Sequence, residues 1–535
     1  MEEKLYYNGK VYCGGGRYAQ AFWVREGRFR WAGDDAALLA AAPEDCPRLD
    51  LHGATVLPGL NDSHLHLLEV GLDLDAVDLY GAASAEELLV RCRAYVTRRR
   101  PAPGQTVVGN GWNEDCFAAP VIPTREMLDG AVSDRPLVLN RVCGHLLCCN
   151  TAALAAAGIT AATPAPEGGG IDLGPDGAPN GILRDNAMAL LNPLLPGKTP
   201  ERCEAAYLAA MARAASYGLT SVQTCDPHAD SWPAVLAALR ALGQKGLITV
   251  RMNLQCAFET PGQLQAFFDA GNHPGTGGRL WQVGSLKLFA DGSLGARTAW
   301  LRRDYADAPG VRGLCCMDKP TALAMVRLAN GNGMPVVAHA IGDAAIEQML
   351  DVYREASPAG NPLRNGIIHC QITTPDQWQR FADEKAAAYV QPVFIDYDHR
   401  IAAARCGGEL AATSYAFHTP AALGVHISYG TDAPVEDCNP FVNLYTAVTR
   451  RARDGAPAGG WHPAERAGRE EAVDRYTIGS AWAEHAENIK GRIAPGYLAD
   501  FTVLDRDYFT VPEDEIAQIQ ATRTVVGGQE VFVRG

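Results

Sequence analysis

Two histidines separated by one residue could bind a metal ion. His64 and His66 follow the apolar run at 56–60. Side chains two positions apart on a strand point to the same face, so the two imidazoles can converge on one cation. A His-x-His pair alone is weak evidence, because two surface histidines arise at this spacing by chance. The surrounding sequence PGLNDSHLH strengthens the metal interpretation.

Four further candidate ligands each lie at the end of a short apolar run. They are Lys287, His339, His369 and Asp432. Taken singly, such residues are more often a snorkelling lysine, a hydrogen-bonded core histidine or a capping aspartate. Their spacing favours a shared site: a TIM barrel gives about 31 residues to each strand–helix unit, and the intervals here are 52, 30 and 63 residues. These intervals predict positions on barrel strands 4, 5, 6 and 8, at the carboxyl ends where barrel enzymes hold their chemistry.

The middle of the chain alternates short apolar runs with Ala-rich amphipathic stretches, which is typical of a parallel sheet covered by helices. We therefore predict an α/β fold with a (β/α)8 TIM barrel over 58–487. Both chain ends alternate apolar and polar residues around turns. Residues 1–57 and 488–535 are predicted to form one small β-sandwich domain that is discontinuous in sequence.

An insertion separates the first part of the barrel from its fourth strand. His66 and Lys287 are 221 residues apart, whereas three barrel units need only about 95 residues. We predict a cap-like region around 70–220 that helps to set specificity. Within it, the Gly/Pro-rich stretch at 160–182 is predicted to be a long surface loop.

Five local sequences add a more specific signal: KLFADGSLGARTA from Lys287, GNGWN from Gly109, TDAPVE from Thr431, AVTRR from Ala447 and GRIAPG from Gly491. Together with the predicted ligands, they resemble the amidohydrolase superfamily, within it amidohydrolase family 3 and the branch that contains the N-substituted formamide deformylases. Cys143, just before Gly144-His145, departs from the branch, which often has a polar or acidic residue there. The resemblance covers nearly the whole chain.

The resemblance implies a complete set of six metal ligands. His64, His66 and Asp432 would bind the more buried metal, His339 and His369 the second, and a carboxylated Lys287 would bridge the two. Carbon dioxide converts a neutral lysine into a carbamate with two oxygens, and burial favours the neutral amine that this requires. We expect two divalent metals per subunit, with zinc as the default, although imidazole also suits iron or nickel. A one-metal variant would use fewer ligands.

The implied chemistry is attack by metal-activated hydroxide on a carbonyl carbon. Asp432 is the predicted catalytic residue, as the base that takes the proton and the acid that returns it to the leaving nitrogen. The leading prediction is hydrolysis of a non-peptide C–N bond in an N-formyl amine, an N-acyl amine or a cyclic amide. The alternatives are a deaminase of a heterocyclic substrate and a catalytically silent ligand-binding homologue.

Four residues are predicted to contact the substrate. They are Trp112, His145, Asp291 and Arg297. For Trp112, simple core packing is an equal alternative. The placement of His145 rests on the resemblance. Arg297 could bind a carboxylate or carbonyl oxygen, or it could pair with Asp291.

Composition limits the partners. Hydrophobic residues make up 47% of the chain, and the formal net charge of −14 opposes nucleic-acid binding. The chain shows neither a signal peptide nor an apolar membrane span, and its 15 cysteines lack a CxxC pair. We expect a cytoplasmic protein with reduced, structural cysteines, a small-molecule substrate and no membrane partner. A homodimer is an open alternative, since no sequence feature marks an interface.

Overall fold

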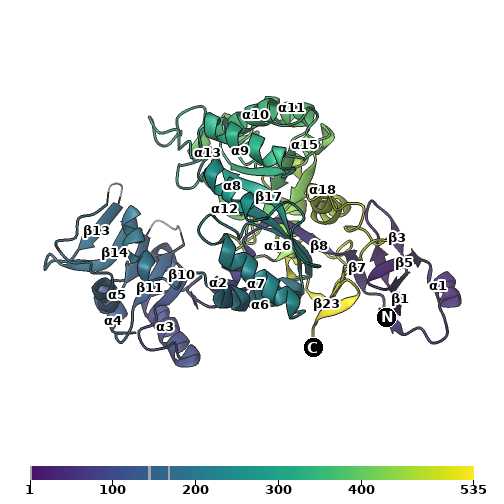
Figure 1. Ribbon diagram of the computed structural model, residues 1–535, viewed down its shortest axis with the longest axis horizontal. Helices are drawn as coiled ribbons and strands as arrows, with labels where there is room; N and C mark the ends of the chain where they lie inside the picture. Colours follow the sequence, from purple (N-terminus) through teal and green to yellow (C-terminus); the bar gives the residue numbers. More distant parts are fainter. Residues whose placement is uncertain (1–2, 143–145, 167–168) are drawn as a thin grey trace. The chain divides into compact units, whose positions relative to one another are not determined.

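The centre of the molecule is a sheet of eight parallel strands (Figure 1). The structure is a computed structural model that describes residues 3–142, 146–166 and 169–535. In chain order the strands are β8 (Leu60–Leu65), β15 (Leu219–Thr224), β16 (Arg251–Ala257), β17 (Trp281–Phe289), β18 (Val336–Ala340), β19 (Gly366–His369), β20 (Ala387–Val390) and β21 (Ile427–Tyr429). Each strand pairs in parallel with the next one in this order.

The first and last strands meet at a seam. The backbone N–H of Asp432 donates to the carbonyl of His64 at 2.8 Å, and the N–H of His66 donates to the carbonyl of Ala433 at 2.7 Å. Asp62 reinforces the seam, because its carboxylate accepts from the hydroxyl of Thr431 at 2.7 Å. The predicted α/β TIM barrel is confirmed.

Helices follow the strands and pack outside the sheet (Figure 1). They include α7 (Trp232–Gln244), α8 (Pro261–Asp269), α9 (Lys319–Gly331), α10 (Asp343–Ala356), α11 (Pro375–Glu384) and α16 (Pro440–Thr449). Capping residues stabilise the start of some of these helices. At α8, the Thr260 side chain accepts from the backbone N–H of Gln263, and the Gln263 side chain accepts from the backbone N–H of Thr260. Strand–helix alternation of this kind leaves the carboxyl ends of all eight strands on one rim.

The two chain ends form two further sheets. The first has the order β5 (Arg28–Gly33), β4 (Ala21–Arg25), β1 (Glu3–Tyr7) and β6 (Arg48–Asp50). The second has the order β24 (Gln529–Val533), β23 (Ala521–Val526), β22 (Phe501–Leu504), β7 (Thr55–Pro58), β2 (Lys10–Tyr12) and β3 (Tyr18–Ala19). Phe22 of the first sheet packs on Phe501 of the second with ring centroids 4.8 Å apart. The predicted sandwich built from both termini is confirmed.

A buried ion pair joins the second terminal sheet to the barrel. Arg251, the first residue of β16, contacts both carboxylate oxygens of Asp500, at 2.7 and 3.0 Å. The same carboxylate accepts from the backbone N–H of Gly527 at 2.6 Å. A buried charged contact therefore connects the sandwich to the barrel.

Residues Glu69–Ala206 form a separate compact unit. Its sheet has the order β13 (Gly169–Leu173), β14 (Pro179–Asp185), β12 (Leu146–Cys149), β11 (Leu137–Arg141), β10 (Val107–Trp112) and β9 (Val77–Asp78). Helix α3 (Ala85–Arg99) contributes Leu88 and Cys92 to the core of this unit. The prediction of a loop over 160–182 is wrong where β13 and β14 pair as antiparallel strands, because the turn between them carries the Gly/Pro signal.

One carboxylate contacts both places where the chain leaves and rejoins the barrel unit. Asp226, which follows β15, accepts from the backbone N–H of Leu68 at 3.0 Å and from the hydroxyl of Tyr207 at 2.8 Å. Leu68 is the last barrel residue before the inserted unit, and Tyr207 is the first one after it. Among the described residues, no helix is long and apolar enough to cross a membrane.

Candidate metal centre

The six predicted ligands lie at the carboxyl ends of the predicted strands. His64 lies on β8 and His66 just after it; Lys287 lies on β17, His339 on β18 and His369 at the end of β19, and Asp432 follows β21. Because all of these strands are parallel, their ends share the rim of the barrel. Lys287, His339, His369 and Asp432 therefore belong to the fourth, fifth, sixth and eighth barrel strands, as their spacing predicts.

Three donor atoms converge on one point of this rim. Oδ1 of Asp432 lies 3.2 Å from Nε2 of His64 and 3.4 Å from Nε2 of His66. One ligand atom from each of the three residues lies within 4.8 Å of the others. Lys287 is adjacent, with its Nζ 3.1 Å from Nε2 of His64. Two imidazoles and a carboxylate at these separations form a donor set that suits a divalent metal.

His339 and His369 extend the cluster on the other side. The ring of His369 lies 5.7 Å from that of His64 and 4.5 Å from that of His339, centroid to centroid. Nε2 of His339 faces the carbonyl of Gly292 at 3.0 Å. All six predicted ligands are therefore brought together in one cluster.

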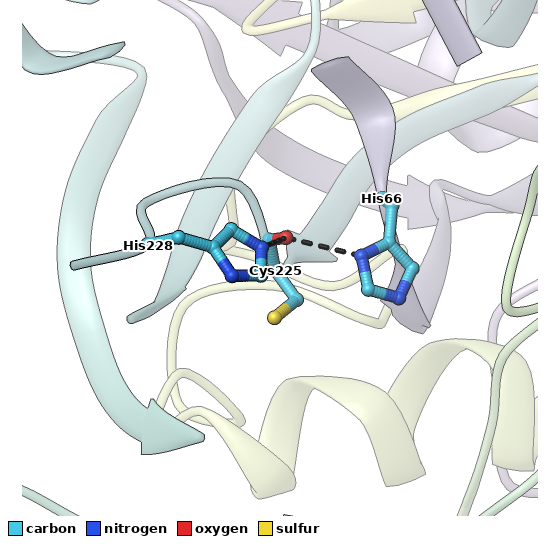
Figure 2. Close-up of side chains that lie close together, drawn as sticks. All are labelled: His66, Cys225 and His228. Atoms are coloured by element: carbon cyan, nitrogen blue, oxygen red, sulfur yellow. Dashed lines mark hydrogen bonds between the residues drawn. The ribbon is translucent and has the colours of Figure 1, made fainter. Parts of the chain in front are cut away.

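Partners on the far side of the rings hold three imidazoles in orientation. Nδ1 of His64 lies 2.6 Å from Oε1 of Gln255, and Nδ1 of His369 lies 2.9 Å from Oε1 of Gln391. Nδ1 of His66 lies 3.1 Å from the carbonyl oxygen of Cys225 (Figure 2). Each acceptor requires a proton on Nδ1, so Nε2 is the nitrogen of each ring that would bind a metal.

Burial disfavours the charged forms of His64, His369 and Lys287. It lowers the pKa of His64 to about 4, with Lys287 adding to the effect. The pKa of His369 is held well below its ordinary value and that of Lys287 is also lowered, both mainly by burial. Neutral imidazoles can bind a metal, and a neutral lysine can react with carbon dioxide.

Asp432 and His66 form the charged part of the cluster. Burial alone would raise the pKa of Asp432, but the close contacts with His64 and His66 outweigh it and hold the pKa well below its usual range. Burial likewise opposes charge on His66, yet the hydrogen bond to Asp432 raises the pKa of His66 to about 10. A proton on His66 thus balances the buried carboxylate, and this is the place that a cation would take.

Two of these residues adopt a left-handed backbone. His369 has φ of +82° and Asp432 has φ of +58°. Residues without a glycine's freedom rarely adopt such angles, and they concentrate at functional sites. These backbone conformations direct the two side chains toward the ligand cluster, and the surrounding barrel must stabilise them.

The four residues predicted to contact the substrate do not share one environment. Trp112 is fully buried in the core of the inserted unit, and its indole N–H donates to the carbonyl of Leu139 at 3.0 Å. That placement is the core-packing alternative, and it leaves the ring no surface for a ligand. His145 lies outside the described residues.

Asp291 and Arg297 do not pair with each other in the structure. Asp291 is buried and accepts from the backbone N–H groups of Trp300, Ile341 and Gly342 at 2.8–3.0 Å. Arg297 forms a two-pronged ion pair with Asp307, at 2.8 and 3.0 Å. Asp291 therefore fixes the loop that follows β18, and the charge of Arg297 is already matched by a neighbour.

Several residues that surround the ligands are not among the predicted site residues. Gln255 lies in an apolar strand, and Cys225 is one of the cysteines predicted to be structural. Burial raises the pKa of a thiol, but hydrogen bonds from His228 and His66 outweigh it and lower the pKa of Cys225 to about 6. A usable signal was present: Cys225 and His228 directly follow the second apolar strand, at the same strand end as the predicted ligands.

Comparison with known proteins agrees with this geometry. A model of the amidohydrolase family matches residues 49–532. The chain belongs to the amidohydrolase family. The superfamily resemblance found in the sequence is thereby confirmed.

Individual relatives match along almost their whole length. YtcJ of Bacillus subtilis, which is named as an amidohydrolase, is 32% identical over 97% of this chain and 96% of its own. The N-substituted formamide deformylase of Arthrobacter pascens is 28% identical over 95% of this chain and 94% of its own. The crystal structure of an uncharacterized metal-dependent hydrolase from Pyrococcus furiosus is 30% identical, with a TM-score of 0.79 over 95% of this chain and 100% of the other.

Proposed function

We propose that this amidohydrolase cleaves a non-peptide C–N bond in an N-formyl amine, an N-acyl amine or a cyclic amide, with the help of divalent metal. The observation that carries the proposal is the convergence of His64, His66 and Asp432 on one point at the barrel rim. The similarity to a formamide deformylase over 95% of the chain supports an amide-type substrate.

The donors suit two metal ions, with zinc as the first candidate. His64, His66 and Asp432 would hold one ion, and His339 and His369 the other. Lys287 would bridge them as a carbamate: it is only 1% exposed, and burial lowers its pKa toward the neutral amine that carbon dioxide requires. When bound, a divalent metal lowers the pKa of a water and polarises a carbonyl oxygen.

Asp432 is the proton carrier in this proposal. Its Oδ1 lies at the point where the donors converge, and its pKa is low enough to keep it ionised. It can accept a proton from the attacking water and return it to the leaving nitrogen, which would otherwise depart as an unfavourable anion. Gln255 and Gln391 fix the orientation of the His64 and His369 rings beside the Asp432 carboxylate.

The test is a substrate screen on the metal-loaded enzyme. Purified protein is analysed for metal content and then incubated with N-formyl amines, N-acyl amines, cyclic amides and amino-substituted heterocycles. We expect the appearance of a free amine or a ring-opened acid, and the loss of this product after chelation. Release of ammonia from the heterocycles would instead identify a deaminase. Absence of bound metal, with stability indifferent to chelators, would favour a silent ligand-binding protein.

A further inference from the structure

A cavity of about 430 Å³ lies at the end of the barrel opposite to the candidate metal centre. Trp281, which lines it, is the first residue of β17, whereas Lys287 lies near the other end of that strand. Ile248 and Thr249 line it just before β16 begins. The volume is within the range of about 300–1,000 Å³ that is typical of small-molecule sites.

Three parts of the barrel unit form the walls of this cavity. They are the last turn of α7, the turn that precedes β17, and the strands β23 and β24 of the terminal sandwich. The residues that they contribute include Gly243 and Gln244 of α7, Gly278 and Arg279 of the turn, and Val526 and Val531 of the sandwich. The cavity is therefore formed where the barrel and the sandwich meet.

A buried hydrogen-bond donor at the wall of the cavity has no protein partner. Trp281 is only 4% exposed, and its indole N–H donates to no acceptor in the part of the chain that the structure describes. Its Nε1 lies 2.9 and 3.5 Å from the positions that a Cβ on Gly278 and on Gly243 would occupy. Because both residues are glycines, no side chain of theirs covers this donor. A buried indole N–H usually has an acceptor, and here the cavity is where one can bind.

Two arginines add positive charge to the same cavity. Arg279 projects from a turn that is closed by a hydrogen bond from the N–H of Gly278 to the carbonyl of Trp281, at 2.8 Å. Within the described ranges it forms no ion pair. Arg240 of α7 donates to the neutral side chain of Asn272 at 3.3 Å and, among the described residues, also lacks a carboxylate partner. Two guanidinium charges therefore line the cavity unmatched.

The nearby carboxylate of Asp500 is already bound by other groups. It pairs with Arg251 and accepts from the backbone N–H of Gly527. Nη2 of Arg251 and Nη2 of Arg279 lie 3.4 and 3.7 Å from the position that a Cβ on Gly527 would occupy, so the two guanidinium groups are close together. An anion beside Arg279 would offset the repulsion between these like charges.

We propose that this cavity binds a small organic anion. Its carboxylate or phosphate group contacts Arg279 and Arg240, because a guanidinium binds either oxyanion through two parallel hydrogen bonds. The indole N–H of Trp281 supplies a third donor, and Ile248 and Val531 provide apolar surface for the body of the ligand. The site goes beyond the proposed hydrolysis, since it lies at the amino ends of the strands and includes none of the six candidate metal ligands.

The test is calorimetric titration of the full-length protein with phenyl phosphate, benzoate and the neutral benzyl alcohol. We expect saturable binding of at least one of the two anions and none of the alcohol, and the tighter anion identifies the oxyanion that the site prefers. Carboxylates and phosphates also bind divalent metals, so each titration is repeated after chelation. Equal affinity with and without metal is expected. No binding of either anion, or binding that disappears with the metal, would overturn the proposal.

The first variant removes charge from the cavity. Arg279→Gln should weaken anion binding by about 10–100-fold, the contribution of a charge-assisted hydrogen bond. The matched control is Arg327→Gln, which removes an exposed arginine of α9 that does not line the cavity. Equal affinities in these two variants would contradict the assignment.

The second variant keeps both charges and covers the indole donor. Gly243→Ala places a methyl group 3.5 Å from Nε1 of Trp281, an ordinary contact distance, and alanine is well tolerated in a helix. We expect anion affinity to fall by about 2–10-fold, the contribution of one neutral hydrogen bond. Gly262→Ala in α8 is the control, because its Cβ would meet no atom within 4 Å. Binding that is lost in Arg279→Gln but equal in these two glycine variants would show attraction to surface charge alone, and would overturn the site.

Discussion

At the scale of single residues, Asp432 is the side chain on which the chemistry depends. Asp432→Asn keeps the size of the side chain but cannot carry a proton between water and nitrogen. We expect kcat to fall by about 10²–10⁴-fold, the range typical of a lost general acid–base, with unchanged circular dichroism. Asp437→Asn is the control, since Asp437 is half-exposed and pairs with Arg213 at 3.0 Å. Activity of Asp432→Asn equal to the control would remove Asp432 as the proton carrier.

Gln255 tests whether the outer partners of the ligands matter. Gln255→Leu preserves the volume but removes the acceptor 2.6 Å from Nδ1 of His64. We expect metal affinity to fall by about 10–100-fold, measured by competition with a chromophoric chelator. Gln223→Leu is the matched control: Gln223 is also a buried barrel glutamine, but it donates to the carbonyl of Ser480. Equal affinities in the two variants would contradict the orienting role.

The ligands could be predicted from the sequence, and their supports could not. Asp432 and His369 end apolar runs at barrel spacing, so both periodicity and motif mark them. Gln255 lies 191 residues from the histidine that it orients, inside a strand that reads as core. Nothing local distinguishes it from a structural glutamine, because its role comes from a contact that only the closed barrel creates.

At the scale of elements, the seam between β21 and β8 holds the centre together. Gly430 lies there, and a Cβ at this position would approach the backbone N and O of His64 at 2.6 and 2.8 Å. Gly430→Ala should therefore lower the free energy of unfolding by about 1–3 kcal/mol, as expected for overpacking, and weaken metal binding. Denaturant unfolding and metal titration measure the two effects.

The control for the seam is Gly408→Ala. Gly408 begins a short helix, and an added Cβ meets no atom within 4 Å. We expect no loss of stability there. If Gly430→Ala has the same free energy of unfolding as Gly408→Ala, close packing between β21 and β8 at Gly430 does not contribute to stability.

The barrel elements were predictable because short apolar runs alternate with Ala-rich amphipathic stretches along the middle of the chain. The inserted unit was harder. Its strand β9 has only two residues, and β13 and β14 flank a Gly/Pro-rich turn that dominates the local signal. Trp112 was ambiguous for the same reason: without the six-stranded sheet, no sequence pattern shows that the ring faces a second core.

At the scale of the whole molecule, the terminal sandwich is fastened to the barrel by the Arg251–Asp500 pair. Their side chains are 14% and 4% exposed, so water screens the charges little. Asp500→Ala leaves a buried arginine unpaired and should cost about 3–5 kcal/mol of stability. Thermal or denaturant unfolding measures this. Glu409→Gln is the control, because its pair with Arg303 is 83–89% exposed and such pairs contribute about 0–1 kcal/mol.

The two hydrogen bonds that Asp226 accepts have an evolutionary consequence. Its carboxylate binds both Leu68 and Tyr207, the two barrel residues that flank the 138-residue inserted unit. The entropy of closing a chain segment grows only slowly with its length, so inserted units of other lengths can be closed at these two residues at little extra entropic cost. Changes within the inserted unit therefore leave the six candidate ligands in place, because all of them belong to the barrel unit.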